Sequence, residues 1–364
     1  MAYLALIIWA YLFFARGRFW RSGPQLPPAK PAQLPSVDII VPARDEQETI
    51  GAALASLRAQ DYAGNFRVIL VDDDSADGTV AAAGTAPNLC VIRGAAKPAG
   101  WSGKLWALHQ GVAAGQASVL LFTDADIVHD PRHLSSLVAR LVTPHAEMVS
   151  EIVRLNCQSR AERLLVPAFV YFFQLLYPFA RVNDPTSRLA AASGGTVLIR
   201  RETLRRIGGI AAIKGALIDD VALAAAVKKS GPIYLGHSGL AASLRRYPHG
   251  LDIWRLISRT AFTQLRYSAG MLALTLAGLG LVWLLPLGEA LFGHGAAAAA
   301  GFAAYALAAV SYLPTLDRYR QNRLLALGLP LIALFYMAAT VDSACNHWFG
   351  KGVRWKNRDY AGGR

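Results

Sequence analysis

The segment LLFTDADIVHDP, residues 120–131, is an apolar run that ends in two carboxylates, Asp124 and Asp126. Short continuous apolar runs bounded by polar residues are typical of strands that are buried on both faces of a sheet. The two acidic side chains then come at the point where the strand meets a loop. The segment therefore predicts a buried strand that carries a pair of carboxylates to one edge of a sheet.

Similar apolar runs, each ending in polar residues, occur at 37–44 (VDIIVPAR), 67–74 (RVILVDDD) and 89–94 (LCVIRG). Segments with helical sequence separate them, at 45–60, 77–84 and 102–115. Alternation of strand and helix predicts right-handed βαβ units, and hence an α/β fold with a mostly parallel sheet flanked by helices. Ligands of such sheets bind at the carboxyl ends of the strands, which is where the acidic residues of this sequence fall.

Two acidic clusters follow these predicted strands. The segment VDDDSADGT (71–79) has three adjacent carboxylates, which repel one another unless a cation or hydrogen-bond donors meet them. Asp124 and Asp126 offer oxygen ligands, which hard cations such as Mg²⁺ or Mn²⁺ prefer when they share substrate phosphates. Helix capping and a solvated loop are the competing interpretations for either cluster alone. The occurrence of both clusters, in order on successive strands, favours a metal and phosphate site.

A cation and a second acidic pair come later in the chain. Lys104, in GWSGKLWALHQG (100–111), lies near a predicted helix start, where the helix dipole adds to its charge and favours phosphate. Asp219 and Asp220 begin an apolar-periodic helix, so they either stabilise its N-terminus or supply a general base for a hydroxyl acceptor. The Gly-rich turn SGGTVLIRR (193–201) lets a sugar lie close to the backbone.

The two ends of the chain are strongly apolar. Hydrophobic residues make up 54% of the sequence and charged residues 17%, a balance too apolar for an ordinary soluble enzyme. The expected organisation is an N-terminal membrane anchor at 1–21, a Pro-rich linker at 22–35, a main domain at 36–268, transmembrane helices within 269–343 and a basic tail at 344–364. The candidate spans are 269–292, 296–313 and 324–341.

Basic residues beside the apolar segments set the expected orientation. ARGRFWR (15–21) and DRYRQNR (317–323) indicate the cytosolic side, which places residues 22–268 in the cytosol. Three spans then carry the basic tail to the far side, so either one span is re-entrant or interfacial, or the tail is an exception. The basic residues that give the net charge of +13 cluster beside the apolar segments. This pattern predicts attraction to anionic lipid headgroups, not binding to nucleic acid. The scattered cysteines fit a reducing cytosol.

The ordered set PARDE (42–46), VDDDSADGT, SGKLWALHQG, TDAD, SGGTVLIRR and IDDVALA resembles the inverting family 2 glycosyltransferases of the GT-A fold, over about residues 36–268. More narrowly, the N-terminal anchor, GWSGKLWALHQG, RTAFTQLRYS (259–268) and the C-terminal spans resemble the bacterial hopanoid-biosynthesis-associated glycosyltransferases, which are related to the ceramide glucosyltransferases. The resemblance implies a GT-A-like, Rossmann-type sheet. It also implies a multi-pass protein of the bacterial inner membrane, with its catalytic domain in the cytosol.

The resemblance implies roles for the strand-end residues. Asp73 would bind the uracil of a UDP-sugar, with the backbone around Pro42 and Ala43 beside it. Asp126 would ligate a divalent cation, Mg²⁺ or Mn²⁺, on the diphosphate, and Asp124 would contact the ribose or the metal.

The resemblance also implies roles for residues outside the strand ends. Lys104 would lie near the nucleotide-sugar, and Asp220 would be the base that deprotonates the acceptor. The family's acidic pair is Glu-Asp, whereas this chain has the shorter Asp219 before Asp220. The family's (Q/R)xxRW signature corresponds here to Thr263, Arg266 and Tyr267, and Arg266 would stabilise the departing UDP by charge-assisted hydrogen bonds.

These features together lead us to expect a membrane-bound, metal-dependent inverting glycosyltransferase. It would transfer a sugar from a nucleotide-sugar donor, a UDP-sugar, to a hydroxyl of a lipid acceptor, in hopanoid or glycolipid biosynthesis. Two alternatives remain. A processive polysaccharide synthase would need a secretion channel, for which three spans are few. A non-catalytic nucleotide-sugar or lipid-binding protein would not require the intact set of acids.

The nearly uncharged, aromatic segment 162–181 has no place in a simple span count, because as a span it would separate the acids before it from those after it. We hypothesise that it lies in the membrane interface and lines an acceptor entrance, together with a basic amphipathic helix at 251–268 that includes Arg266. A buried core helix is the alternative. The sequence assigns no role to His129 or His133.

Overall fold

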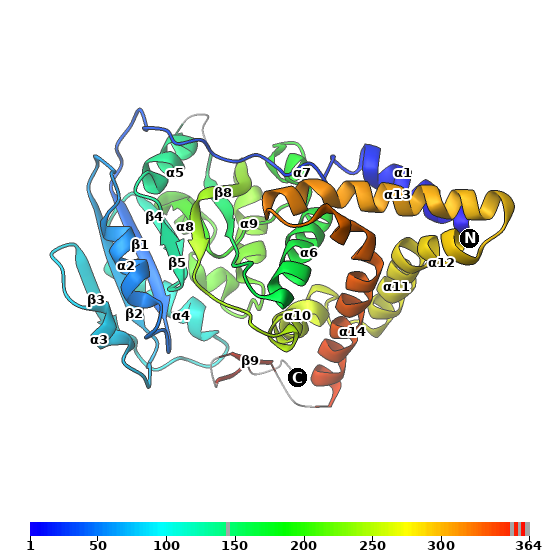
Figure 1. Ribbon diagram of the computed structural model, residues 1–364. Helices are drawn as coiled ribbons and strands as arrows, with labels where there is room; N and C mark the ends of the chain where they lie inside the picture. Colours follow the sequence, from blue (N-terminus) through cyan, green and yellow to red (C-terminus); the bar gives the residue numbers. More distant parts are fainter. Residues whose placement is uncertain (143–145, 350–352, 356–357, 361–364) are drawn as a thin grey trace. The chain divides into compact units, whose positions relative to one another are not determined.

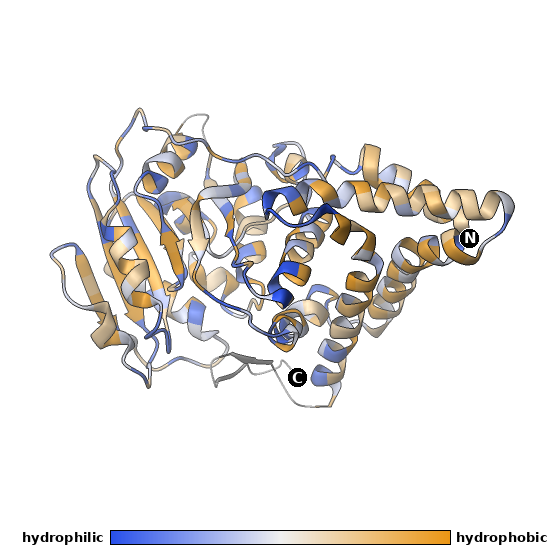
Figure 2. Ribbon diagram, in the orientation of Figure 1, coloured by the Kyte–Doolittle hydropathy of each residue, from blue (hydrophilic) through white to orange (hydrophobic). Residues whose placement is uncertain are grey.

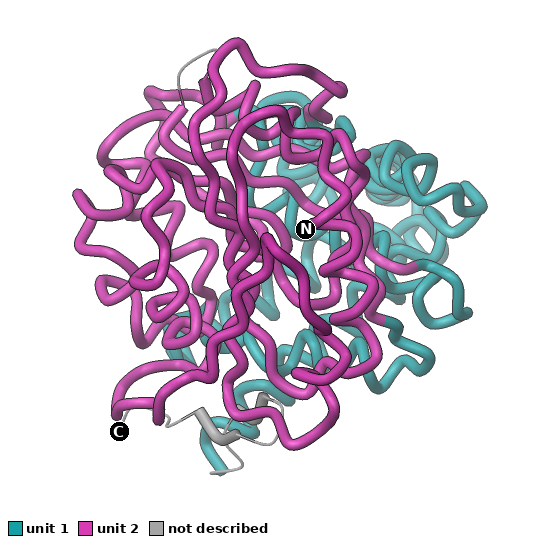
Figure 3. Tube along the Cα trace, turned by 90° about the vertical axis from the view of Figure 1, so that its left-hand side faces the viewer, with its two compact units in different colours: residues 1–23, 157–180, 246–364 teal, residues 24–156, 181–245 magenta. Residues whose placement is uncertain are grey.

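The structure is a computed structural model, and it describes residues 1–142, 146–349, 353–355 and 358–360 (Figure 1). The chain forms two compact units, which Figure 3 distinguishes by colour. Unit 1 contains residues 1–23, 157–180 and 246–364, and unit 2 contains residues 24–156 and 181–245. The domain limits expected from the sequence remain predictions.

Unit 2 is built on an eight-stranded sheet with the strand order β3-β2-β1-β4-β7-β6-β8-β5 (Figure 1). Its strands are β1 (Val37–Ala43), β2 (Phe66–Asp72), β3 (Leu89–Arg93), β4 (Val119–Thr123), β5 (Ile127–His129), β6 (Met148–Arg154), β7 (Thr196–Arg200) and β8 (Ile233–Ser243). β1 to β4 are parallel, as are β6 and β8. β7 is antiparallel to β4 and β6, and β5 is antiparallel to β8. The expected α/β fold with a mostly parallel sheet is confirmed.

Helices cover both faces of this sheet. Unit 2 contains α2 (Ile50–Arg58), α3 (Thr79–Ala83), α4 (Gly103–Ala114), α5 (His133–Val142), α8 (Arg201–Arg206), the 3-10 helix η2 (Ile210–Ile213) and α9 (Asp219–Lys228), and α7 (Phe179–Asn183) lies at its junction with unit 1. Leu54 of α2 and Leu137 of α5 share a core cluster with Ile39 of β1. On the opposite face α4 packs closely, since a Cβ atom at Gly111 would lie 2.4 Å from the side chain of Ile40. The strand is therefore buried on both faces, as its apolar run predicts.

Unit 1 is mostly helical. Its elements are α1 (Ala2–Ala10), the π-helix η1 (Tyr11–Ala15), α6 (Arg160–Leu176), α10 (Gly250–Gln264), α11 (Ala269–Leu279), the π-helix η3 (Gly280–Leu284), α12 (Leu285–Phe292), α13 (Gly295–Arg318), the 3-10 helix η4 (Arg323–Gly328), α14 (Leu329–Trp348) and the paired strands β9 (Val353–Trp355) and β10 (Arg358–Tyr360). Part of the basic tail expected at 344–364 lies outside the described residues.

Within the described residues, three helical segments are long and apolar enough to cross a membrane, at Ala269–Phe292, Gly295–Arg318 and Arg323–Trp348. Their hydrophobic character is visible in Figure 2. The three C-terminal candidate spans expected from the sequence therefore form long apolar helices. The N-terminal apolar segment forms a shorter helix, and Trp9 Nε1 donates to the Val282 carbonyl (2.7 Å).

The segment expected at the membrane interface, α6, packs inside unit 1. The Tyr171 hydroxyl lies 2.6 Å from Ser311 Oγ of α13, and the Tyr336 hydroxyl of α14 donates to the Leu165 carbonyl (2.9 Å). Its outer face keeps apolar side chains such as Leu176, which is 49% exposed. One face of α6 is thus a packed core face, as the core-helix alternative expects.

The amphipathic helix expected at 251–268 is shorter than predicted. α10 ends at Gln264, so Arg266 lies beyond the helix, with a left-handed φ of 52°, and does not share its face. α10 is held against α14 because the Trp254 indole and the Ser258 hydroxyl both donate to the Asp342 carboxylate (2.9 and 2.7 Å).

A buried chain of hydrogen bonds holds the end of β4 in unit 2. Thr123 Oγ1 donates to the Gly195 carbonyl (2.9 Å), so it accepts a hydrogen bond from His129 Nε2 (3.1 Å). His129 Nδ1 then accepts from His133 Nδ1 (2.7 Å). His133 Nε2 and Glu151 Oε2 are 2.8 Å apart and share one proton. Burial and the neighbouring His133 lower the pKa of His129, which keeps its ring neutral.

This chain links β4, β5, α5 and β6 through side chains that are each no more than 5% exposed. It ends at Thr123, the residue before Asp124. Because buried polar groups are costly when they lose a partner, the network fixes the strand end from which both carboxylates of the D-x-D segment project.

The variant His133→Leu is expected to lose about 3–5 kcal/mol of stability, because it leaves the buried Glu151 carboxyl group without its partner. The double variant His133→Leu/Glu151→Leu should recover much of this loss, since removing both polar partners at similar volume is nearly neutral. Urea denaturation of the purified full chain, followed by tryptophan fluorescence, measures both. If the double variant loses at least the sum of the two single losses, the two residues are not coupled.

Candidate functional site

Asp73 directly follows β2 and lies beside the end of β1. Its backbone N–H donates to the Ala43 carbonyl (2.8 Å), and the residue is 5% exposed. Pro42 is in register with Val71 on the neighbouring strand. Arg44 Nη1 donates to the Asp73 carbonyl and lies 3.9 Å from the Asp73 carboxylate. The structure thus brings Asp73 beside Pro42 and Ala43 at the ends of two neighbouring strands, with Arg44 as the cation that adjacent carboxylates need.

Hydrogen bonds join the loop after β1 to the loop after β2. The Ala76 N–H donates to the Asp45 carboxylate (2.8 Å), the Glu46 N–H to Thr79 Oγ1 (2.8 Å) and the Gly78 N–H to Gln47 Oε1 (2.8 Å). Each bond crosses from one loop to the other, so the two strand ends are held together by the protein itself.

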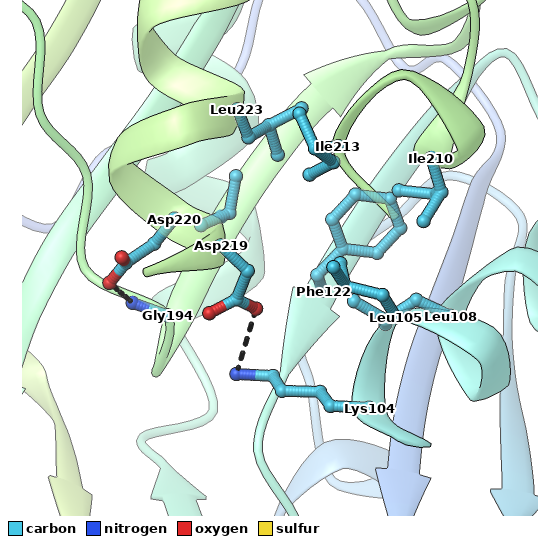
Figure 4. Close-up of a pocket in the computed structure, with 11 residues that line it drawn as sticks. Lys104, Leu105, Leu108, Phe122, Gly194, Ile210, Ile213, Asp219, Asp220 and Leu223 are labelled. Atoms are coloured by element: carbon cyan, nitrogen blue, oxygen red, sulfur yellow. Dashed lines mark hydrogen bonds and ion pairs between the residues drawn. The ribbon is translucent and has the colours of Figure 1, made fainter. Parts of the chain in front are cut away.

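Lys104 is the cation at the centre of the second acidic group. Ser102 caps α4 by accepting the Leu105 N–H (3.2 Å), which places Lys104 in the first helical turn. Lys104 Nζ lies 2.8 Å from Asp124 Oδ1. It also lies 3.5 Å from Asp219 Oδ2 (Figure 4). Although burial lowers the pKa of Lys104, the charges of Asp124 and Asp219 outweigh it, and the pKa is raised. Lys104 therefore remains charged between residues from two separate motifs.

Asp220 accepts two backbone hydrogen bonds at the start of α9. The Gly194 N–H donates to Oδ2 at 2.8 Å (Figure 4), and the Val221 N–H donates to Oδ1 at the same distance. Burial, followed by the charge of Asp219, raises the pKa of Asp220 to about 7, although Lys104 and the two N–H groups oppose this. The carboxyl group therefore titrates near neutral pH, as a general base at that pH requires.

Asp126 is the buried member of the D-x-D segment. Arg245 Nε donates to Asp126 Oδ2 (2.9 Å), and the Arg245 guanidinium also reaches Glu46 Oε1 (3.0 Å). Burial is the main cause that raises the pKa of Asp126, with Asp124 and Glu46 adding to it and Arg245 opposing it. Burial and the neighbouring acids disfavour a negative charge on Asp126, so a cation at this carboxylate would stabilise its ionised form.

The two carboxylates after β4 have the chemistry of a site for a hard cation. Within the described part of the chain, no group of three or more His, Cys, Asp or Glu side chains is placed to hold a metal. Mg²⁺ and Mn²⁺ bound with substrate phosphates need only one or two protein carboxylates, however. Asp124 and Asp126 fit this kind of site, in which the donor would complete the coordination.

A pocket opens beside Lys104 and the acidic pair. Its lining residues come from α4, β4, β7 and the segment before it, η2 and α9. They are Lys104, Leu105, Leu108, Phe122, Gly194, Val197, Ile210, Ile213, Asp219, Asp220 and Leu223. Figure 4 shows the Asp219 side chain pointing toward Lys104 and the Asp220 side chain pointing toward Gly194, with Phe122, Leu105 and Ile210 on the apolar side. A Cβ atom at Gly194 would lie 3.0 Å from Lys104 Nζ. A larger residue here would therefore crowd the ammonium group, whereas glycine leaves room for it.

Arg266 belongs to unit 1, unlike the other expected site residues. Arg266 and Tyr267 both have left-handed backbone angles, with φ of 52° and 56°, and the Tyr267 ring stacks on His347 with centroids 4.5 Å apart. The segment therefore has a defined local structure. The role of Arg266 toward the departing nucleotide remains a prediction.

Sequence reasoning assigned no role to Arg44, Glu46 or Arg245, although all three contact site carboxylates or one another. The motif PARDE contains the first two, so the motif gave a signal for them. No motif marks Arg245, because its position opposite Asp126 results from the pairing of β5 with β8.

Comparison with known proteins identifies relatives of parts of this chain. A curated N-acetylglucosaminyltransferase of Bradyrhizobium elkanii is 58% identical over 45 residues, which cover 12% of this chain and 25% of that protein. Another, of Neorhizobium galegae, is 48% identical over 64 residues, covering 17% of this chain and 14% of that protein. The chain thus spans a quarter or less of the length of these two relatives.

Among solved structures, the chain is similar to the mannosyltransferase PcManGT from Pyrobaculum calidifontis, in complex with GDP-Man and Mn²⁺. The TM-score is 0.57 at 20% identity, over 96% of this chain and 100% of that chain. At this identity the likeness shows a common fold. The Glycosyl transferase family 2 model matches residues 38–208, a range that holds Asp73, Lys104 and the D-x-D pair but ends before Asp219. The chain therefore has the GT-A fold and contains, at residues 38–208, a family 2 glycosyltransferase domain.

Proposed function

We propose that the chain is a membrane-bound inverting glycosyltransferase that transfers a sugar from a nucleotide-sugar to a hydroxyl group of a lipid acceptor. The observation that carries the proposal is the Asp220 carboxyl group, which lines a pocket beside Lys104 and has a pKa raised to about 7. A carboxylate of this kind accepts the proton of an attacking hydroxyl at neutral pH. One base and one displacement invert the configuration of the anomeric carbon.

On this proposal, the donor binds along the carboxyl edge of the sheet. Asp73 contacts the nucleobase beside Pro42 and Ala43, and Lys104 lies near the diphosphate. A divalent cation held by Asp126 and Asp124 would neutralise charge on the diphosphate as it leaves. Asp219 holds Lys104 beside the Asp220 base, since its carboxylate lies 3.5 Å from Lys104 Nζ. Arg266 would add a charge-assisted hydrogen bond to the leaving nucleotide.

The proposed acceptor and location follow from the apolar helices. Three segments long enough to cross a membrane, together with basic flanks, support an integral protein of the bacterial inner membrane. We propose that residues 36–268 face the cytosol and use a membrane-embedded hydroxyl lipid, in hopanoid or glycolipid biosynthesis. The names of the relatives make nucleotide-activated N-acetylglucosamine and GDP-mannose donors to compare with UDP-glucose.

Asp220→Asn should lower sugar transfer about 10²–10⁴-fold, because an amide cannot accept the hydroxyl proton. Donor binding should persist, since the amide leaves the pocket volume unchanged. Nucleotide release and equilibrium donor binding by the full chain in lipid nanodiscs measure the two effects. Asp219→Asn is the matched control, with a smaller loss of transfer. Equal losses in both variants would contradict the assignment of the base to Asp220.

The rate of transfer should rise with pH through about 7, because Asp220 is active only when ionised and its pKa is about 7. Below that pH the protonated carboxyl cannot act as a base. Lys104→Met removes a charge that lowers this pKa, so its kcat/KM profile should move to higher pH. Lys229→Met, at an exposed position of α9's C-terminal end, is the control and should leave the midpoint in place. An unshifted Lys104→Met profile would refute the coupling.

Chelation of divalent cations should abolish transfer, and Mn²⁺ or Mg²⁺ should restore it. Asp126→Asn should raise the cation concentration needed for half-maximal rate by about 10-fold or more, since it removes a charged oxygen ligand. Glu46→Gln, which also contacts Arg245, is the control for disturbing that arginine. Full activity in excess EDTA would rule out the metal.

A further inference from the structure

A second pocket lies wholly within unit 1. It is open to solvent, and its volume is about 1000 Å³ with the open mouth included. The lining residues come from the start of α6 and from the turn between α13 and η4, and they are Cys157, Arg160, Arg163, Leu164, Tyr319, Arg320, Gln321, Asn322 and Leu325. Neither the residues of the donor site nor Arg266 lines this pocket.

The lining carries three arginines and no carboxylate. Among the described residues, Arg160, Arg163 and Arg320 form no ion pair, and all three are exposed. Nearby acids are already engaged: both oxygens of Asp317 bind Arg323 at 2.8 Å. Glu162 is buried and accepts backbone N–H groups, including that of Tyr247 (2.6 Å). The positive charge of the pocket is therefore uncompensated.

The turn that presents Arg320 is a defined structure. Arg320 has a left-handed φ of 53°, while the preceding Tyr319 is buried. The Gln321 amide donates to the Tyr319 carbonyl (2.8 Å), and Asn322 Oδ1 accepts the Leu324 N–H (2.9 Å). A left-handed non-glycine residue is strained and persists only where its surroundings impose it. These contacts hold the Arg320 backbone at the pocket.

The pocket lies at the joint between two candidate membrane spans. One candidate span ends at Arg318 and the next begins at Arg323. In a membrane, the turn that lines the pocket would therefore lie at the level where a helix leaves the hydrocarbon. Figure 2 shows hydrophilic residues at this end of α13, in contrast to its apolar length. Lipid phosphates lie at this depth, and basic pockets between membrane helices bind anionic headgroups.

We propose that this pocket binds the phosphate group of an anionic membrane lipid, through the guanidinium groups of Arg160, Arg163 and Arg320. Arginine suits this task because its fixed fork of N–H donors matches phosphate oxygens in pairs. The acyl chains would extend from the joint along the apolar surface of the candidate spans. The inference depends on insertion of these spans into a membrane, but not on sugar transfer.

The test uses the purified full chain in detergent and counts bound lipid by native mass spectrometry during titration with phosphatidylglycerol or phosphatidylcholine. Phosphatidylglycerol should bind more tightly. Arg320→Gln should weaken its binding about fivefold, and Arg163→Gln/Arg320→Gln about 30-fold, if each arginine contributes as a basic residue near anionic headgroups does. Arg58→Gln is the matched control, because Arg58 is also an exposed arginine but belongs to α2 of unit 2 and does not line the pocket.

Equal binding of the two lipids, or an equal loss in the Arg58→Gln control, would overturn the proposal. Inorganic phosphate distinguishes the source of the anion: it should compete only weakly, and competition at concentrations similar to those of the lipid would indicate a soluble phosphate site instead. A further measurement uses the unaltered chain, so it does not depend on whether the variants fold. Phosphatidylglycerol should slow alkylation of Cys157, in the pocket, relative to exposed Cys90. Unchanged Cys157 alkylation would also count against the proposal.

Discussion

The candidate site depends on one group of partly buried charges, the Lys104 ammonium between Asp124 and Asp219, whose side chains are 22–36% exposed. Charges that are partly withdrawn from water are stabilised when they are paired, so each member of the group holds the others in place. Asp124 comes from the end of β4, Lys104 from the start of α4 and Asp219 from the start of α9. The pairing therefore ties three distant parts of the sequence to one point, and Asp220 lies beside that point with its pKa raised.

Hydrogen bonds away from these charges fix the strand and the helix that carry Asp124 and Lys104. The Thr123–His129–His133–Glu151 chain fixes the end of β4, and Ser102 fixes the first turn of α4. Both networks consist of partners that are costly to leave unpaired. A site built in this way is organised before any ligand binds, which is the condition for stabilising charge that develops during a reaction.

The sequence predicts those parts of the fold whose burial produces an apolar run within a short stretch of residues. β1, β2 and β4 are buried on both faces, so each appears as an unbroken apolar run with acids at its end, and Asp73, Asp124 and Asp126 could be found from that pattern. The antiparallel strand β7 and the three-residue strand β5 could not be predicted in this way, because their positions depend on pairings with residues far along the chain. Arg245 shows the consequence: Ser243 pairs with Ile127, and this register alone brings Arg245 to Asp126. The length of α10 was also misjudged, since its amphipathic pattern continues past Gln264 while the backbone turns at Arg266.

The most direct test of the account is whether the full chain, purified and returned to lipid, moves a sugar onto that lipid. UDP-glucose, a nucleotide-activated N-acetylglucosamine and GDP-mannose would each be incubated with the protein, bacterial membrane lipids and Mn²⁺. Free nucleoside diphosphate and the masses of the lipids would then be measured. The account predicts release of nucleoside diphosphate from at least one donor, matched by a lipid that has gained the mass of one sugar. Absence of nucleoside diphosphate release with every donor would contradict it.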